Sequence, residues 1–165
     1  PDELKKQLKM HNVRAVRMFP APKDHYYSIA SWNCGELFSM LEVCRIPLFI
    51  GLDQLSFNDL YNLCCQYPEL RIVLTELGYS VNRNIYALMD NCTNLHVEIS
   101  GYKVHNGIEE ICGRFGAHRL IFGSRMPEFS AGSAVAMVRY ARISEKEKRM
   151  IAGENLENLL MGVVL

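Results

Sequence analysis

The sequence lacks several features that would place it in a specialised class. Its 18 basic and 18 acidic residues give a formal net charge of zero, so no excess of charge favours DNA or RNA. Its apolar runs, such as 46–50, are far too short to cross a membrane. The first residues have no hydrophobic centre and no signal-peptide cleavage site, and the missing initiator Met leads us to expect residues upstream of Pro1.

Cysteine pairs of the C-x-x-C type are also absent. The six cysteines are Cys34, Cys44, Cys64, Cys65, Cys92 and Cys112. Most lie inside apolar helical patterns, so we expect buried, reduced thiols rather than disulfides or zinc ligands. These features predict a cytoplasmic protein that contacts neither nucleic acid nor membrane.

What the sequence does contain is a regular alternation of short β-branched runs and longer amphipathic stretches. The runs predict five strands, at 13–19, 46–50, 71–75, 95–99 and 119–122. Their starts lie about 24 to 33 residues apart, so each gap has room for a helical crossover and is too long for a hairpin. The pattern predicts an α/β fold of parallel strands with outer helices. A closed (β/α)8 barrel takes about 250 residues, so this chain holds roughly five of the eight units.

The predicted helices have recognisable starts and buried faces. Ser56 with Asp59, and Ser144 with Glu147, match the pattern of an N-terminal capping box. The stretch 28–43 places five apolar residues near one face, which we expect to be buried: Ile29, Trp32, Leu37, Met40 and Leu41.

Several phrases, in order along the chain, resemble the amidohydrolase-related metal-dependent hydrolases. Segment 119–127 reads RLIFGSRMP and is similar to the last-strand phrase RLLFGSDxP of that family. Weaker matches lie at 13–20, 67–74, 94–100 and 143–160. The resemblance implies a TIM-like barrel. It also implies that residues 1–165 are one domain, the carboxyl-terminal part of that barrel, with strands four to eight.

Three positions depart from the family pattern. In its metal-dependent members a His follows the fifth strand, another follows the sixth, and an Asp ends the eighth; the matched positions here hold Gly51, Glu76 and Arg125. Gly51 offers no ligand atom, and Arg125 cannot bind a metal because its guanidinium group stays protonated. The resemblance therefore implies no intact metal site in this chain. We expect no cofactor, and a divalent metal only if residues upstream of Pro1 supply ligands.

Glu76 and Arg125 carry opposite charges where two of these strands end. In parallel α/β folds, functional groups gather beyond the carboxyl ends of the strands. We predict that both side chains point into the barrel mouth and pair there, directly or through a ligand. The alternative is that each is a separate, solvated loop charge.

Other candidate residues lie at the same strand ends. Arg17 shares a strand face with apolar neighbours, where it would bind an anionic substrate together with Arg125. Alternatively, Arg17 pairs with a structural carboxylate, Asp53 or Glu98, both of which are also candidates for substrate binding. His105 follows a strand and is a candidate acid or base, unless it is an ordinary solvated histidine.

The resemblance implies hydrolase- or decarboxylase-like chemistry on a small substrate with a carboxylate or amide group. We expect Glu76 to act as the base, with Arg125 and His105 as further catalytic candidates. The alternative is a non-catalytic barrel that binds a small ligand or serves as a structural subunit. Because five parallel strands leave open sheet edges, we also expect a longer native chain or, failing that, a homo-oligomer.

Overall fold

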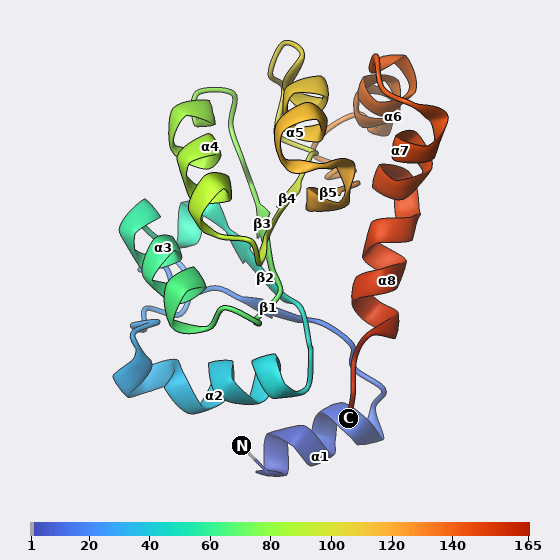
Figure 1. Ribbon diagram of the computed structural model, residues 1–165. Coiled ribbons are helices and arrows are strands. Elements are labelled where there is room, and N and C mark those ends of the chain that lie inside the picture. The colour runs from blue at the N-terminus through green and yellow to red at the C-terminus, as the bar shows by residue number, and fades with distance from the viewer. Residues whose placement is uncertain (1) are drawn as a thin grey trace.

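A parallel sheet of five strands forms the centre of the molecule, with neighbours in chain order from β1 to β5 (Figure 1). The computed structural model describes residues 2–165. The strands are β1 (Val16–Met18), β2 (Leu48–Gly51), β3 (Ile72–Thr75), β4 (Leu95–Glu98) and β5 (Leu120–Ile121). Every neighbouring pair is parallel, and helices fill the connections between them. The predicted arrangement of parallel strands with outer helices is confirmed.

Eight α-helices accompany the strands in the described part of the chain. They are α1 (Asp2–Met10), α2 (Ser31–Val43), α3 (Phe57–Gln66), α4 (Asn82–Asn91), α5 (Gly107–Phe115), α6 (Ala131–Tyr140), α7 (Glu145–Arg149) and α8 (Asn155–Met161). The 3-10 turns η1 (Leu52–Gln54) and η2 (Ala117–Arg119) and the π-helical turn η3 (Met150–Glu154) complete the chain. Helix α1 is not among the elements that the sequence patterns predict.

Both predicted capping boxes are present. The hydroxyl of Ser56 accepts a hydrogen bond from the Asp59 backbone N–H at 3.1 Å, and the hydroxyl of Ser144 accepts one from the Glu147 N–H at 3.3 Å. In each box the carboxylate accepts the backbone N–H of the serine in return. These bonds satisfy donors that the first turn of a helix otherwise leaves free, which fixes where α3 and α7 begin.

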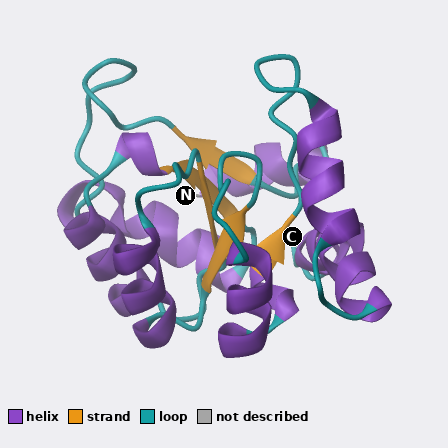
Figure 2. Cartoon of the chain, turned by 90° about the horizontal axis from the view of Figure 1, so that it is seen from above, coloured by secondary structure: helices purple, strands orange, loops and turns teal. Residues whose placement is uncertain are grey.

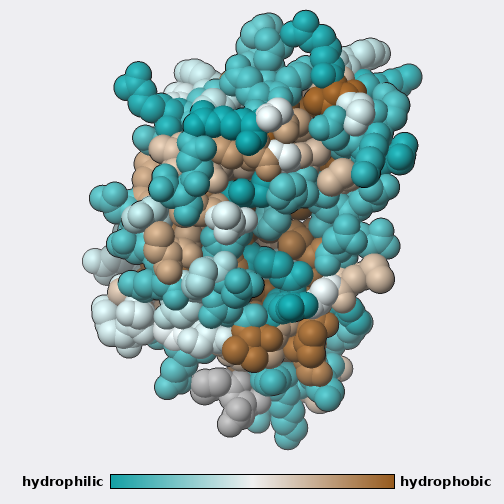
Figure 3. All heavy atoms as spheres, in the orientation of Figure 1, coloured by the Kyte–Doolittle hydropathy of each residue, from teal (hydrophilic) through white to brown (hydrophobic). Residues whose placement is uncertain are grey.

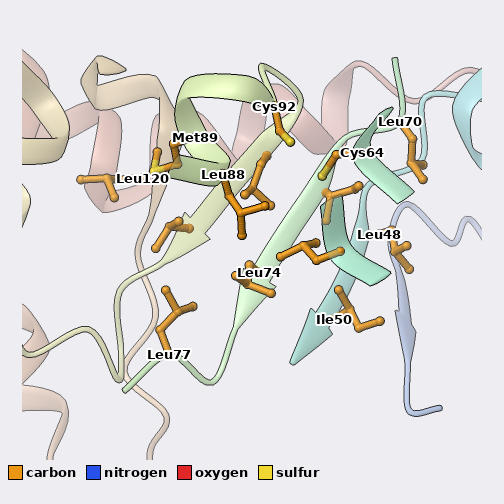
Figure 4. Close-up of a cluster of buried hydrophobic side chains, with 14 of the residues drawn as sticks. Leu48, Ile50, Cys64, Leu70, Leu74, Leu77, Leu88, Met89, Cys92 and Leu120 are labelled. Carbon is orange, nitrogen blue, oxygen red and sulfur yellow. The ribbon is translucent and has the colours of Figure 1, made fainter. Parts of the chain in front are cut away.

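One face of the sheet packs against helices α2 to α5 and forms the main hydrophobic core. Strand residues such as Leu48, Ile50 and Leu74 point outward from the sheet to meet helical residues such as Leu88 and Cys64 (Figure 4). Seen from above, the helices stand around the strands (Figure 2). This packing explains the near-continuous apolar runs of the strands, because their side chains are covered rather than solvated.

Helix α8 covers the opposite face of the sheet, which would line the interior of a closed barrel. Helix α8 lies on the other side of the strands from α3 and α4 (Figure 1). Its residues Leu159 and Leu156 pack in a second apolar cluster with Phe49, Val73 and Ile121. In a closed barrel that space is filled by side chains from the other strands. The five-stranded sheet therefore buries its inner face against its own last helix.

The free edge of β5 is also covered by the chain itself. The Phe122 N–H donates to the carbonyl oxygen of Ile151 at 3.1 Å. The Asn155 side-chain amide donates at 2.8 Å to the carbonyl oxygens of Ala117 and Leu120. These groups would otherwise be unpaired at the sheet edge, so the expectation of two open edges is wrong for β5.

Two smaller expectations are corrected. Trp32 is 79% exposed, because α2 instead buries the face that holds Cys34, Phe38 and Leu41. Cys65 is exposed, whereas the other five cysteines are buried, and all six are free thiols.

Exposed apolar side chains gather low on the face shown in Figure 3, near the two ends of the chain. In the part of the chain that is described, no helix has both the length and the apolar character needed to span a membrane.

Candidate functional site

The carboxyl ends of β1, β3 and β5 bring three charged side chains into one cluster. Glu76 accepts a hydrogen bond at Oε1 from Nη2 of Arg17 at 2.8 Å, and its Oε2 forms an ion pair with Nη1 of Arg125. The Glu76 side chain is only 18% exposed, whereas Arg17 and Arg125 are 46% and 36% exposed. The predicted pair of Glu76 with Arg125 is present. The partner of Arg17 is Glu76, not Asp53 or Glu98.

The backbone at two of these positions is unusual for residues that carry a side chain. Glu76 has a φ of 60° and Arg125 a φ of 52°, so both lie in the left-handed region. This conformation costs about 1–2 kcal/mol for a residue other than glycine. It turns the chain sharply just past β3 and just past β5. At both positions the residue at the sharp turn supplies a side chain to the cluster.

Gly51, at the end of β2, leaves room for the Glu76 side chain. A Cβ atom at this position would lie 3.0 Å from Cγ of Glu76 and 2.3 Å from Oδ1 of Asp53. Gly51 therefore leaves space for the cluster because it has no side chain. It lets the carboxylate of Glu76 reach the arginines on either side.

Arg125 is held by further contacts from its own loop. Its Nε donates to Oε2 of Glu128 at 2.6 Å, and its guanidinium carbon lies 5.2 Å from the centre of the Phe129 ring. The ammonium group of Lys103 lies 4.1 Å from the same ring centre. Phe129 therefore contacts cations from the loops after β4 and β5 and joins these loops through cation–π interactions.

Glu98 lies on the inner face at the end of β4, beside the cluster but bonded elsewhere. Its carboxylate accepts hydrogen bonds from the backbone N–H of Ser100 at 2.8 Å and from the Ser100 hydroxyl at 2.7 Å. Burial raises the pKa of Glu98 and the charge of Glu76 adds to this, while the Ser100 bonds and Arg125 oppose it. A Cβ at Gly123 would lie 1.7 Å from Oε1 of Glu98, so Glu98 packs directly on the backbone of the next strand end.

Asp53 belongs to a separate, more exposed group. It forms an ion pair with Lys23 and accepts a hydrogen bond from the Gln54 side-chain amide at 3.3 Å. Burial would raise the pKa of Asp53, but the hydrogen bonds from Lys23 and Gln54 outweigh it and lower the pKa. Gln54 itself is buried and also donates to Asp24 at 2.8 Å. This group ties the loop after β1 to the turn after β2.

His105 does not join either group. It is exposed in the loop between β4 and α5, which matches the solvated-histidine alternative. Sequence reasoning did not identify Lys23, Lys103, Glu128 and Phe129 as neighbours of the candidates. Each lies in a loop after a strand, and only that placement could have indicated them.

The residues at the family's metal positions do not fit a divalent cation. Of Gly51, Glu76 and Arg125, only Glu76 has a ligand atom, and two guanidinium groups already occupy its oxygens. A cation placed there would meet two positive charges at close range. Among the described residues, no three His, Cys, Asp or Glu side chains form a group that could hold a metal ion.

Known proteins share this architecture. The uncharacterised TIM-barrel protein Bb4693 from Bordetella bronchiseptica superimposes with a TM-score of 0.79 at 17% identity, over 96% of this chain and 60% of that chain. The 5-carboxyvanillate decarboxylase LigW from Sphingomonas paucimobilis gives 0.71 at 15% identity, over 97% and 62%. A 2,6-dihydroxybenzoate decarboxylase, in complex with 2,6-dihydroxybenzoate, gives 0.73 at 14% identity, over 97% and 66%.

These matches establish the fold class as the TIM-barrel type, with five of its βα units in this chain. The chain spans about three fifths of the length of the first of these structures. No curated protein sequence matches it.

The sequence model of the amidohydrolase family matches residues 1–160. The chain therefore belongs to the amidohydrolase family.

Proposed function

We propose that this amidohydrolase-family chain binds a small carboxylate at its Arg17–Glu76–Arg125 cluster and acts as a hydrolase- or decarboxylase-like enzyme without the family's metal site. The observation that carries the proposal is the position of the Glu76 carboxylate between two guanidinium groups at the strand ends. A guanidinium group matches the planar geometry of a carboxylate, so a ligand carboxylate can take the place of Glu76.

Displacement would also free Glu76 for chemistry. Between the two arginines both oxygens of Glu76 are engaged, whereas a carboxylate released from them beside a bound ligand can accept a proton. Glu98 lies nearby, and its raised pKa lets it hold a proton to a higher pH than an ordinary carboxyl group does, which makes it the candidate proton donor. Two of the similar structures are decarboxylases of aromatic carboxylates, which supports this substrate class.

A second candidate function is a non-catalytic barrel that binds a ligand or serves as a subunit. The observation that favours it is the same cluster, because both oxygens of Glu76 are already compensated. A cluster of this kind also holds three loops together with no ligand present. Both functions predict that the cluster binds a ligand, but only the enzyme predicts turnover.

The test is titration of the protein with 2,6-dihydroxybenzoate, followed by calorimetry, together with an assay for released carbon dioxide. We expect saturable binding that weakens at least tenfold in Arg17→Ala and in Arg125→Ala. In Glu76→Gln we expect at least tenfold tighter binding, because the internal competitor loses its charge, together with loss of any turnover. Arg83→Ala, an exposed arginine of α4, is the control and should bind as the unaltered protein does.

Binding with turnover supports the enzyme. Binding without turnover for this acid or for a set of related benzoates and their amides would favour the non-catalytic barrel. If the unaltered protein does not bind the carboxylate, or if Glu76→Gln binds it no better, the proposed role of the cluster is wrong.

A further inference from the structure

The opposite end of the sheet holds an arginine whose charge has no partner. Arg71 lies directly before β3, and its Nε and Nη2 atoms are buried and form no hydrogen bond with any described residue. No carboxylate of the described residues lies within ion-pair distance of Arg71. Buried donors without a partner cost free energy, and a buried charge without one costs more.

The surroundings of Arg71 add positive charge. Burial lowers the pKa of Arg71, and the nearby charge of Arg45 lowers it further. Arg45 directly precedes the segment that leads into β2, and it too forms no ion pair within the described chain. Arg45 and Arg71 therefore lie in each other's field at the same end of the sheet, and neither forms an ion pair with a described residue.

A cavity of about 700 Å³ adjoins both arginines. Its lining consists of Glu42, Val43, Arg45, Pro68, Glu69 and Arg71. This volume is in the range of small-molecule sites. Oε1 of Glu42 accepts the backbone N–H of Glu69 at 2.9 Å, so that carboxylate is directed toward the turn before β3.

The guanidinium group of Arg71 lies against the end of α8. A Cβ at Gly162 would lie 2.6 Å from Nη1 of Arg71, so the glycine makes the approach possible. In this position Nε and Nη2 are out of contact with solvent. Rotation of the side chain would bring these donors into the cavity that Arg45 also lines, within reach of a ligand.

We propose that Arg45 and Arg71 form a binding site for an oxyanion, the phosphate or carboxylate group of a small ligand, in this cavity at the amino-terminal ends of β2 and β3. The anion joins the two guanidinium groups and gives the buried donors of Arg71 the partner that they lack. Glu42 and Glu69 also line this cavity and oppose the binding of an anion, an effect that the two guanidinium groups must outweigh. The site is separate from the Arg17–Glu76–Arg125 cluster and does not depend on its function.

The experiment is calorimetric titration with inorganic phosphate at constant ionic strength. We expect saturable binding by the unaltered protein and at least tenfold weaker binding by Arg71→Met and by Arg45→Ala. Arg83→Ala, which removes an exposed arginine elsewhere, should keep the original affinity. Competition by acetate would identify a carboxylate as an accepted group, and its absence would restrict the site to phosphate.

Thermal unfolding without added anion gives an independent readout. Arg71→Met removes an unpaired, partly buried charge, so its Tm should equal or exceed that of the unaltered protein, which also shows that this variant folds. Binding of 2,6-dihydroxybenzoate at the other end of the sheet should be unchanged in Arg71→Met, so the two proposals fail separately. The proposal is overturned if phosphate does not bind, if Arg83→Ala loses as much affinity as Arg71→Met, or if chloride raises the Tm as much as phosphate does.

Discussion

The arginines at the two ends of the sheet differ in the partners of their guanidinium groups. At the carboxyl-terminal end, Arg17 and Arg125 share the carboxylate of Glu76 and remain partly exposed. At the amino-terminal end, Arg71 has buried donors without a partner, while Arg119 donates to the carbonyl oxygens of Leu95 and Cys92. At the carboxyl-terminal end, a ligand must therefore compete with the Glu76 carboxylate for the two arginines. At the amino-terminal end, a ligand would supply the hydrogen-bond partner that the buried donors of Arg71 lack.

The two ends also differ in how acid affects them. Burial, followed by the charge of Arg119, lowers the pKa of His96 to about 4 on the inner face near the amino-terminal end. At the other end, burial raises the pKa of Glu98. Acid therefore forces a charge onto a partly buried histidine at one end, while at the other it neutralises a partly buried carboxylate.

The largest expected effect is that of His96→Gln on the pH dependence of stability. Because the folded pKa of His96 lies below that of the unfolded chain, its neutral form stabilises the protein above about pH 6.5, and this contribution is lost as the pH falls toward 4. The loss amounts to about 3 kcal/mol at most. Urea unfolding at pH 7 and at pH 4.5 should show a smaller loss of stability for His96→Gln than for the unaltered protein. Equal losses in the two proteins would contradict the assignment.

Arg119→Met should destabilise the protein by about 2–3 kcal/mol, because it removes two charge-assisted hydrogen bonds and leaves the Leu95 and Cys92 carbonyl oxygens without them. Arg71→Met is the matched substitution at a guanidinium group that lacks such bonds. Denaturant midpoints of the two variants should therefore move apart. The distinction between these arginines would be lost if both variants were destabilised to the same degree.

Gly123→Ala tests the packing at the carboxyl-terminal end. Its new Cβ would overlap Oε1 of Glu98, so we expect a loss of about 1–2 kcal/mol as that carboxylate moves. Gly78→Ala is the control, since nothing lies within 4 Å of the added atom. Thermal unfolding of the two variants measures the difference, and similar Tm values would show that Glu98 has room to move.

Glu98→Gln should have the smallest effect, and its sign is informative. A raised folded pKa means that the charged carboxylate costs stability, a cost that grows as the pH rises through the folded pKa. The variant should therefore gain stability relative to the unaltered protein between pH 4 and pH 7. Unfolding midpoints across this range provide the measurement, and a relative loss at pH 7 would show that the Ser100 bonds dominate instead.

The sequence predicted the elements whose signals are local. The apolar runs located the strands, although β1 and β5 are shorter than expected, and the pairs Ser56 with Asp59 and Ser144 with Glu147 located two helix starts. Trp32 was placed on the wrong face, because helical spacing alone did not identify which side of α2 meets the sheet. The cover that α8 provides over the inner face arises from contacts between distant segments, such as Leu159 with Val73, and leaves no local signal.

The sequence predicted the candidate site only in part, because some of its contacts depend on how distant segments pack. The expectation that functional groups gather beyond the carboxyl ends of parallel strands placed Glu76 and Arg125 together, because their strands end at the same edge of the sheet. It did not identify Glu76 as the partner of Arg17, since that pair depends on how far two long side chains reach from β1 to the turn after β3. It also gave no sign of Arg71, because an unpaired charge is visible only once every neighbour is placed.

The contrast between the two ends is tested most directly by NMR of the arginine Nε–Hε groups during a titration with inorganic phosphate. We predict that the signals of Arg71 and Arg45 shift at phosphate concentrations that leave Arg17 and Arg125 unchanged, because only the latter pair has an internal carboxylate to hold it. If Arg17 and Arg125 respond first, or if all four respond together, the charges at the two ends are not compensated in the way described.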